Sequence, residues 1–153
     1  MKNRLFLWLA FIAAAQMAIA QNQNRVGIAL KAFNNDTAQY LKQRIVANKN
    51  SYIGKPFDSL LLDLPAANGY IDGVDPRNRN ISPHLTLFFS TSTNVHEKLK
   101  RREMPAVLII TWATPLNVNE PAHKGIKAAG DWTTAAYYYY KNKIIADVQV
   151  VRD

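Results

Sequence analysis

The first twenty residues restrict the fold most, because they decide how much of the chain has to fold and in which compartment. Lys2 and Arg4 give a cationic start, an unbroken apolar run covers residues 5–15, and residues 18–20 are the small-x-small triplet Ala-Ile-Ala that signal peptidase accepts. The apolar run is shorter than the ~20 residues that span a bilayer. We therefore expect residues 1–20 to be a cleaved signal peptide that sends the protein to the periplasm or out of the cell.

Residues 21–153 then have to fold without covalent cross-links. The chain of 153 residues contains no cysteine, so neither a disulfide nor the lipid anchor of a bacterial lipoprotein is available. The remaining length is that of one ordinary domain and is enough to bury a core. The net charge of +8 falls to about +6 when Lys2 and Arg4 leave with the leader. We interpret residues 21–153 as a single soluble domain of bacterial type, with no transmembrane segment.

The first part of this domain has the pattern of an amphipathic helix. Asp36 and Gln39 are spaced as in a capping box. Tyr40, Leu41 and Ile45 then recur at helical spacing, with polar residues between them. The pattern predicts a helix that begins after Asp36. The preceding stretch could be a helix or a strand, because its periodicity favours neither.

A second, shorter helix is expected between two prolines. Pro56 suits a first helical position, where its missing N–H costs nothing, and Pro65 stops the helix. The apolar stripe of this helix consists of Phe57, Leu60, Leu61 and Leu64. Residues 66–83 are rich in Asn-Gly, Asp-Gly and Asp-Pro pairs, which are typical of turns. We expect turns and no regular element there.

The second half of the chain has the patterns of strands. Leu85, Leu87 and Phe89 alternate with polar residues. Residues 107–112 are apolar on both faces, as in a central strand that is covered on each side. Residues 135–151 have the pattern of a hairpin, with a turn around residues 141–143. We favour a two-residue loop, which places Tyr137 and Tyr139 on the same face as Ile144, Ala146 and Val148; a three-residue loop would exchange them for Tyr138 and Tyr140.

Helices followed by antiparallel strands predict an α+β fold. In this arrangement the N-terminal helices pack on one face of a meander of about four strands. No internal repeat divides the chain, which again favours a single domain over residues 21–153.

The sequence gives little support for an enzyme. His84, His96 and His123 lie far apart, and none has a second ligand at the spacing of a metal site. Nucleophile, phosphate-loop and dinucleotide motifs are absent, so we expect no metal and no cofactor. A small exported hydrolase is still an alternative if an acid–base site forms only in the fold. Its candidate residues would be His84, His96, Glu97 and Asp131.

Two groups of residues are candidates for binding. The basic run Lys100, Arg101 and Arg102 could attract an anionic partner, although Glu97 and Glu103 flank it and a solvated loop has the same composition. Trp132, Tyr138 and Tyr140 could hold a sugar ring or a peptide, although a sheet covered by helices would use the same side chains for packing.

These patterns favour a binding module over an enzyme. We expect an exported domain that holds an envelope protein, a peptide or a glycan. Nucleic acid is excluded as a partner by the expected location outside the cytoplasm. The sequence does not identify the ligand or the oligomeric state.

Overall fold

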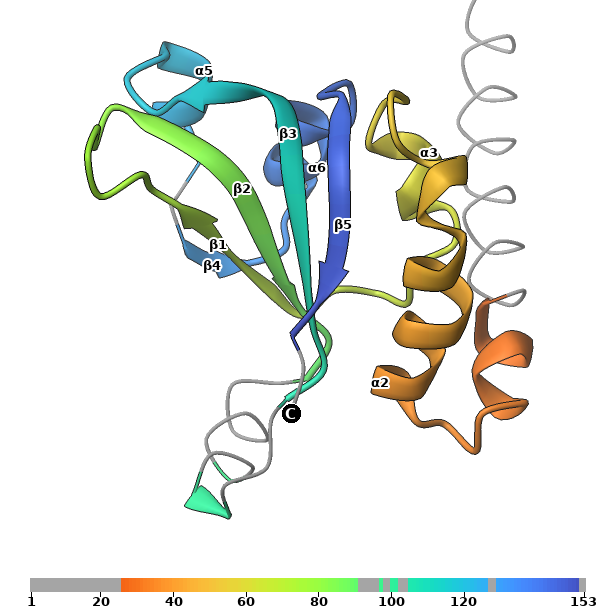
Figure 1. The fold of residues 1–153 in the computed structure, drawn as a ribbon. Helices are drawn as coiled ribbons and strands as arrows, with labels where there is room; N and C mark the ends of the chain where they lie inside the picture. Colours follow the sequence, from red (N-terminus) through yellow and green to blue (C-terminus); the bar gives the residue numbers. More distant parts are fainter. Residues whose placement is uncertain (1–25, 91–96, 98–99, 102–104, 127–128, 152–153) are drawn as a thin grey trace, which may run out of the picture.

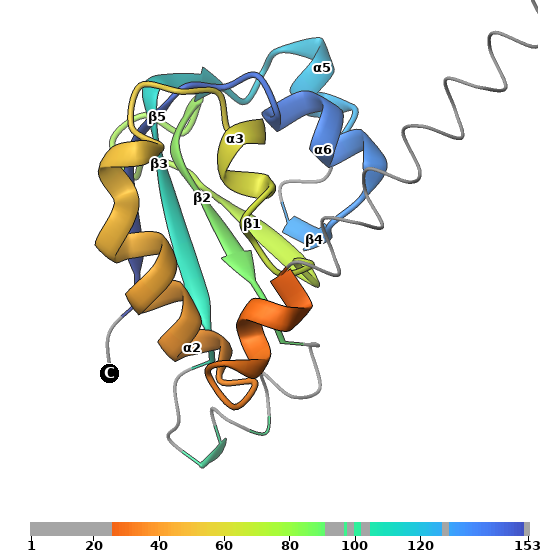
Figure 2. The same ribbon diagram turned by 90° about the vertical axis from the view of Figure 1, so that its right-hand side faces the viewer.

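The computed structural model describes residues 26–90, 97, 100–101, 105–126 and 129–151. Its centre is an antiparallel sheet of five strands in the order β4-β1-β2-β3-β5. The strands are β1 (Gly69–Gly73), β2 (Ile81–Phe88), β3 (Val107–Asn117), β4 (Ala129–Asp131) and β5 (Ile145–Val150). The helices lie on one face of this sheet, so the fold is α+β with two layers (Figure 1, Figure 2).

The helical layer comes from both halves of the chain. Its elements are α2 (Thr37–Tyr40), η1 (Leu41–Ile45), η2 (Val46–Ser51), α3 (Asp58–Leu61), α5 (Pro121–Lys124) and α6 (Thr134–Tyr140). Residues 26–31 are helical too, so the stretch before Asp36, for which the sequence allowed a helix or a strand, contains a helix. None of the helices in the described part of the chain has the length and apolar character needed to pass through a bilayer.

α2, η1 and η2 follow one another without a break and form one irregular helix. It begins where the sequence predicts, because the Asp36 carboxylate accepts a hydrogen bond from the backbone N–H of Gln39 at 3.0 Å. Asn34 and Asn35 precede it with positive φ angles, a conformation that asparagine tolerates. η1 is a π-helix and η2 a 3₁₀-helix, and both pack against β5.

The core lies between this helical layer and the inner face of the sheet. Leu85, Ile110 and Val148 stand in one row across β2, β3 and β5, and all three are fully buried. Leu41 and Ile45 of η1 are fully buried as well. The predicted alternation is therefore confirmed at Leu85 and Leu87, which are both buried, whereas Phe89 lies just beyond the end of β2 and is half-buried.

The second predicted helix is present, although it starts later than the prolines suggest. Phe57, Leu60 and Leu64 are buried and Leu61 is half-buried against the core, which confirms the apolar stripe. Pro56 lies outside α3 and pairs instead with Ile144 in an antiparallel bridge. Two further hydrogen bonds, from Gly54 to Ile145 and from Ile145 to Lys55, join this segment to the start of β5.

The predicted C-terminal hairpin is wrong. Its first arm is the helix α6, and only the return arm is a strand, β5. Thr133 caps α6, since its hydroxyl accepts a hydrogen bond from the backbone N–H of Ala136 at 3.2 Å. Ala136 and Tyr140 are buried four residues apart, which is helical spacing. The cap and this packing outweigh the preference of consecutive tyrosines for strands.

Two expectations about the sheet need correction. The segment predicted to hold only turns contains β1, because Gly69–Gly73 pairs with β2 along its whole length. The strands also exceed the predicted meander of about four. β4 returns to the edge beside β1, and β5 pairs with β3. A bulge between Thr111 and Trp112 in the β3–β5 pairing lets both Ile145 and Val148 face the core.

Candidate functional site

A buried polar network lies in the inner layer, under α6. Asp72 shares its row of the sheet with Leu85, so its side chain faces the core. One carboxylate oxygen accepts a hydrogen bond from the Tyr140 hydroxyl at 2.6 Å. The other lies 3.0 Å from Nε2 of His123, which donates if the carboxyl is ionised. Three elements, β1, α5 and α6, are thus tied together at one carboxyl group.

Aromatic rings surround this network. The Tyr140 ring lies nearly parallel to the rings of Trp112 and Trp132, at centroid distances of 5.8 and 5.9 Å. Tyr70 and Tyr139 meet its edges in T-shaped contacts. These rings keep water away from the carboxyl group, which strengthens its hydrogen bonds and also raises the cost of its charge.

The pKa values of the network follow from this burial. Burial raises the pKa of Asp72 above its usual range, while hydrogen bonds from Tyr140 and His123 act in the opposite direction. Burial, followed by the hydrogen bond to Asp72, also raises the pKa of Tyr140. The phenol therefore stays protonated and serves as a donor, so the network is held as a fixed set of hydrogen bonds.

The network has the composition of an acid–base pair but not the access that catalysis requires. The side chains of His123 and Asp72 are 5% and 0% exposed. They line neither the cleft formed by residues between 26 and 63 nor the cavity between residues 114–117 and 142–144. A substrate atom would have to come within ~3 Å of the imidazole. We interpret the network as structural.

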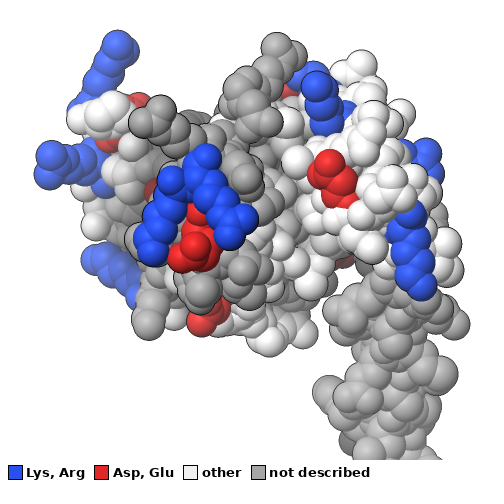
Figure 3. Space-filling model, turned by 90° about the horizontal axis from the view of Figure 1, so that it is seen from below, with Lys and Arg blue, Asp and Glu red and all other residues white. Residues whose placement is uncertain are grey.

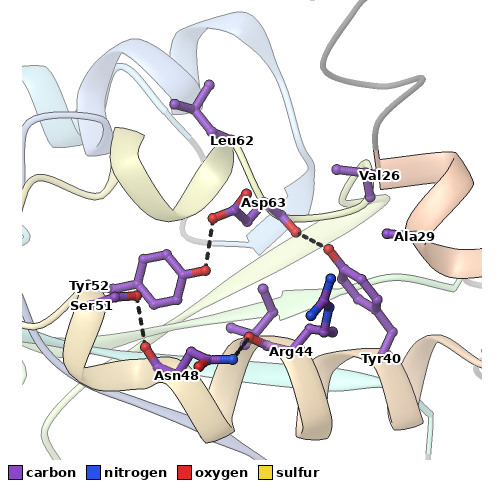
Figure 4. A pocket seen from close by; sticks show the side chains of 10 residues that line it. Val26, Ala29, Tyr40, Arg44, Asn48, Ser51, Tyr52, Leu62 and Asp63 are labelled. Carbon is purple, nitrogen blue, oxygen red and sulfur yellow. Dashed lines mark hydrogen bonds between the residues drawn. The ribbon is translucent and has the colours of Figure 1, made fainter.

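A second group of polar side chains lies around an open cleft of ≈ 350 Å³ between α2–η1–η2 and the end of α3 (Figure 4). We call it the polar cleft. Its polar side chains are Tyr40, Arg44, Asn48, Ser51, Tyr52 and Asp63. Its apolar rim includes Val26 and Ala29 from the helical residues 26–31, together with Leu62.

Two tyrosines hold Asp63 at the wall of the polar cleft. The Tyr52 hydroxyl donates to the Asp63 carboxylate at 2.8 Å, and the Tyr40 hydroxyl donates to the Asp63 backbone carbonyl at 2.7 Å (Figure 4). Burial and the hydrogen bond to Asp63 raise the pKa of Tyr52, so its phenol stays a donor. The carboxylate is thus fixed in position although it comes from a different part of the chain than the helix.

The opposite wall is the irregular helix itself. Tyr40, Arg44, Asn48 and Tyr52 recur at every fourth residue and form one stripe that faces the cleft. The backbone of Asn48 leaves helical geometry, with φ −108° and ψ 19°. Its side-chain amide compensates by donating to the Arg44 carbonyl at 2.9 Å. π and 3₁₀ segments inside helices are often found at functional sites.

The aromatic residues predicted to bind a ligand lie in three different environments. Trp132 packs edge-on against Phe57 and Tyr70 in the aromatic cluster. Tyr140 is fully buried. Tyr138 is 62% exposed, and the Lys141 ammonium lies 4.7 Å from its ring centroid. The structure does not bring the three rings together on one surface.

The basic residues are also dispersed. Lys100 pairs with Glu97 at 3.3 Å, and Arg101 is exposed. Arg102 lies outside the described residues. Figure 3 shows basic side chains scattered over the lower face of the molecule, with their densest group lying against acidic atoms. The described part of this face therefore carries no continuous basic field.

The candidate residues of a hydrolase do not converge either. His84 lies on β2, opposite Gly73 on the outer face, whereas Asp131 is exposed on the edge strand β4. Glu97 is exposed, and His96 is outside the described residues. Within the described ranges, no three His, Asp or Glu side chains are grouped as metal ligands would be.

Sequence reasoning missed both arrangements seen here. The Asn-Gly and Asp-Gly pairs around Asp72 predict a turn, although Tyr70 and Asp72 alternate as they would on one face of a strand. The polar stripe from Tyr40 to Tyr52 was visible in the sequence, but Asp63 can be added to it only in three dimensions. No protein-family model, no curated protein and no solved structure matches this chain.

Proposed function

We propose that the protein is a binding module and that the polar cleft is its binding site. The observation that carries this proposal is that Arg44 and Asp63, which bear opposite charges, line one cleft without pairing with each other. Charged side chains next to an apolar rim are typical of sites that fix the orientation of a small ligand or of a partner's side chain. A cleft of this kind suits a peptide or protein partner better than a flat surface would.

The volume supports a small ligand or a single inserted group. Ligand sites commonly measure about 300–1,000 Å³, so ≈ 350 Å³ is at the lower end of that range. A glycan partner is less well supported, because the Tyr40 and Tyr52 rings are almost fully buried and offer little face for a sugar to stack on.

The site can be tested by NMR chemical-shift mapping with panels of peptides and glycans. We expect a ligand to shift amide resonances of residues 40–52 and of Asp63. Arg44→Gln should abolish or strongly weaken these shifts. Lys42→Gln is the matched control, because Lys42 lies on the same helical element, is exposed and does not line the cleft. Equal binding by both variants would contradict the assignment of the site.

We also propose that the protein is exported after removal of residues 1–20. The cationic start and the short apolar run of the sequence support this. Intact-mass measurement of the protein from its native cells should give a chain that begins at Gln21, recovered from the periplasm or the medium. A cytoplasmic protein that retains Met1 would contradict export without affecting the polar cleft.

A hydrolase is the alternative function. Only the 3.0 Å contact between Asp72 and His123 supports it, and both side chains are closed off from solvent. The binding module therefore explains more of what the described residues show.

A further inference from the structure

We propose that the ligand of the polar cleft is a zwitterion, either a free α-amino acid or a short peptide with both ends free, whose carboxylate meets Arg44 and whose ammonium meets Asp63. This inference rests on the proposed function and specifies its ligand. It follows from how the hydrogen-bonding groups of the cleft are already used.

Each neutral donor group of the cleft already makes one hydrogen bond within the protein, and only the Asn48 amide keeps a second N–H. The Tyr52 hydroxyl donates to Asp63, and the Asn48 amide donates to the Arg44 carbonyl. The Ser51 hydroxyl donates to the Asn48 carbonyl at 2.8 Å. A sugar or another neutral polar ligand would have to compete with these internal hydrogen bonds, which are worth about as much as those it would form.

The charged groups, in contrast, retain free capacity. No hydrogen bond or ion pair with another described residue engages the Arg44 guanidinium. In Figure 4 it extends from the helix beside the Tyr40 ring, toward the side of the cleft where Asp63 lies. From the described residues the Asp63 carboxylate accepts one side-chain hydrogen bond, that of Tyr52, and it has further lone pairs. Recognition in this cleft is therefore ionic.

Two opposite charges in one small cleft select for a ligand that carries both. A simple anion such as phosphate would pair with Arg44 but would be repelled by Asp63. A simple cation would meet the reverse problem. A neutral ligand would displace water from both charges and pair with neither, which is costly. A zwitterion pairs with both, and the guanidinium can hold its carboxylate through two parallel hydrogen bonds.

The experiment uses four forms of one dipeptide. Alanyl-alanine with both ends free is compared with its N-acetyl form, its C-terminal amide and the doubly blocked form, and free alanine tests the smaller ligand. Binding is followed by NMR on the purified protein through the amide shifts of residues 40–52. We expect the free dipeptide, free alanine or both to bind. Each block should weaken dipeptide binding at least tenfold, which corresponds to about 1.4 kcal/mol.

Variants of Arg44 and Asp63 test which of the two side chains binds which end of the dipeptide. Arg44→Gln should remove the difference between the free dipeptide and its amide while preserving the effect of acetylation. Asp63→Asn should do the opposite, and its amide oxygen can still accept the hydrogen bond from Tyr52. Lys42→Gln should behave as wild type. Thermal unfolding of each variant confirms that the fold is intact.

The outcomes separate this inference from the proposed function. If the doubly blocked dipeptide or a neutral sugar shifts the cleft as strongly as the free dipeptide does, the zwitterion is the wrong ligand class but the binding site stands. If only anions or only cations bind, the inference also fails. If none of these probes shifts residues 40–52, and the peptide and glycan panels do not either, both the inference and the proposed function fail.

Discussion

At the scale of single residues, Gly73 and His84 show how the outer face of the sheet fixes a side chain. The two residues face each other across β1 and β2. A Cβ atom at position 73 would overlap the His84 imidazole, so the ring occupies the space that the glycine leaves. Glycine leaves room here for the close approach of a neighbouring side chain and does not serve a turn.

This contact predicts a compensating pair of substitutions. Gly73→Ala should destabilise the protein by about 1 kcal/mol, because the methyl group forces the imidazole into another rotamer. In a His84→Ala background the same substitution should cost much less. Urea unfolding of the wild type, the two single variants and the double variant measures the coupling. Additive effects would show that the ring does not lie over Gly73.

Asp72 gives a second prediction at this scale, which concerns pH. Its pKa should lie above the usual value of about 3.9, because burial is the dominant cause of its shift. Tyr140→Phe should raise this pKa further, since the lost hydrogen bond favours the ionised form. Carboxyl ¹³C NMR titration measures both values. A lower pKa in the variant would contradict the role given to Tyr140.

The same shift has a consequence for stability. Because the pKa of Asp72 is raised in the folded state, the contribution of its protonation to folding stability is fully present below the pKa of the unfolded state. This contribution is lost as the pH rises through the folded-state pKa. The effect is opposite in sign to that of an exposed, salt-bridged carboxylate.

At the scale of elements, the sequence predicts the secondary structure correctly where packing follows the local pattern. It predicts the wrong structure where tertiary packing overrides that pattern. The helix after Asp36 was predictable because its cap and its buried Leu41 and Ile45 lie within a few residues of one another. The helix α6 was not predictable, because four consecutive tyrosines favour a strand. The contact that supports the helix, the hydrogen bond from Tyr140 to Asp72, joins residues far apart in the sequence. For the same reason the polar cleft could not be predicted in full: Asp63 joins it only through tertiary structure.

α3 provides a test of how an element is anchored. Leu60→Ala should cost about 2–5 kcal/mol, because Leu60 is fully buried between the helix and the sheet. Leu62→Ala, two residues away, is the matched control. Leu62 is 54% exposed, so its truncation should change stability by less than about 0.5 kcal/mol. Denaturant unfolding of both variants checks the placement, and a loss under about 1 kcal/mol at Leu60 would refute it.

At the scale of the whole molecule, an ion pair joins the first half of the chain to its end. Lys49 of η2 reaches Asp147 of β5 at 2.7 Å. The hydrogen bond from Lys49 makes the largest contribution to the lowered pKa of Asp147. Because this pKa is lowered in the folded state, the stabilisation is present above the unfolded pKa and is lost as the pH falls through the folded-state value.

NMR titration can measure this long-range link. Lys49→Met should raise the pKa of Asp147 toward the usual value of about 3.9, and high salt should reduce the difference between variant and wild type. Gln149→Ala should have a smaller effect in the same direction, because the Gln149 amide donates to the other carboxylate oxygen at 2.7 Å. An unchanged pKa in Lys49→Met would show that the pair does not persist in solution.

The position of β5 determines when the protein can fold. β5 is the last strand along the described residues, and it pairs with β3 at the edge of the sheet and contacts η1 and η2. Contacts between residues so distant in sequence form slowly and require nearly the entire polypeptide to be present. The core therefore cannot close before β5 has paired with β3, and shortening the chain before Ile145 would remove the fully buried side chains of Ile145 and Val148.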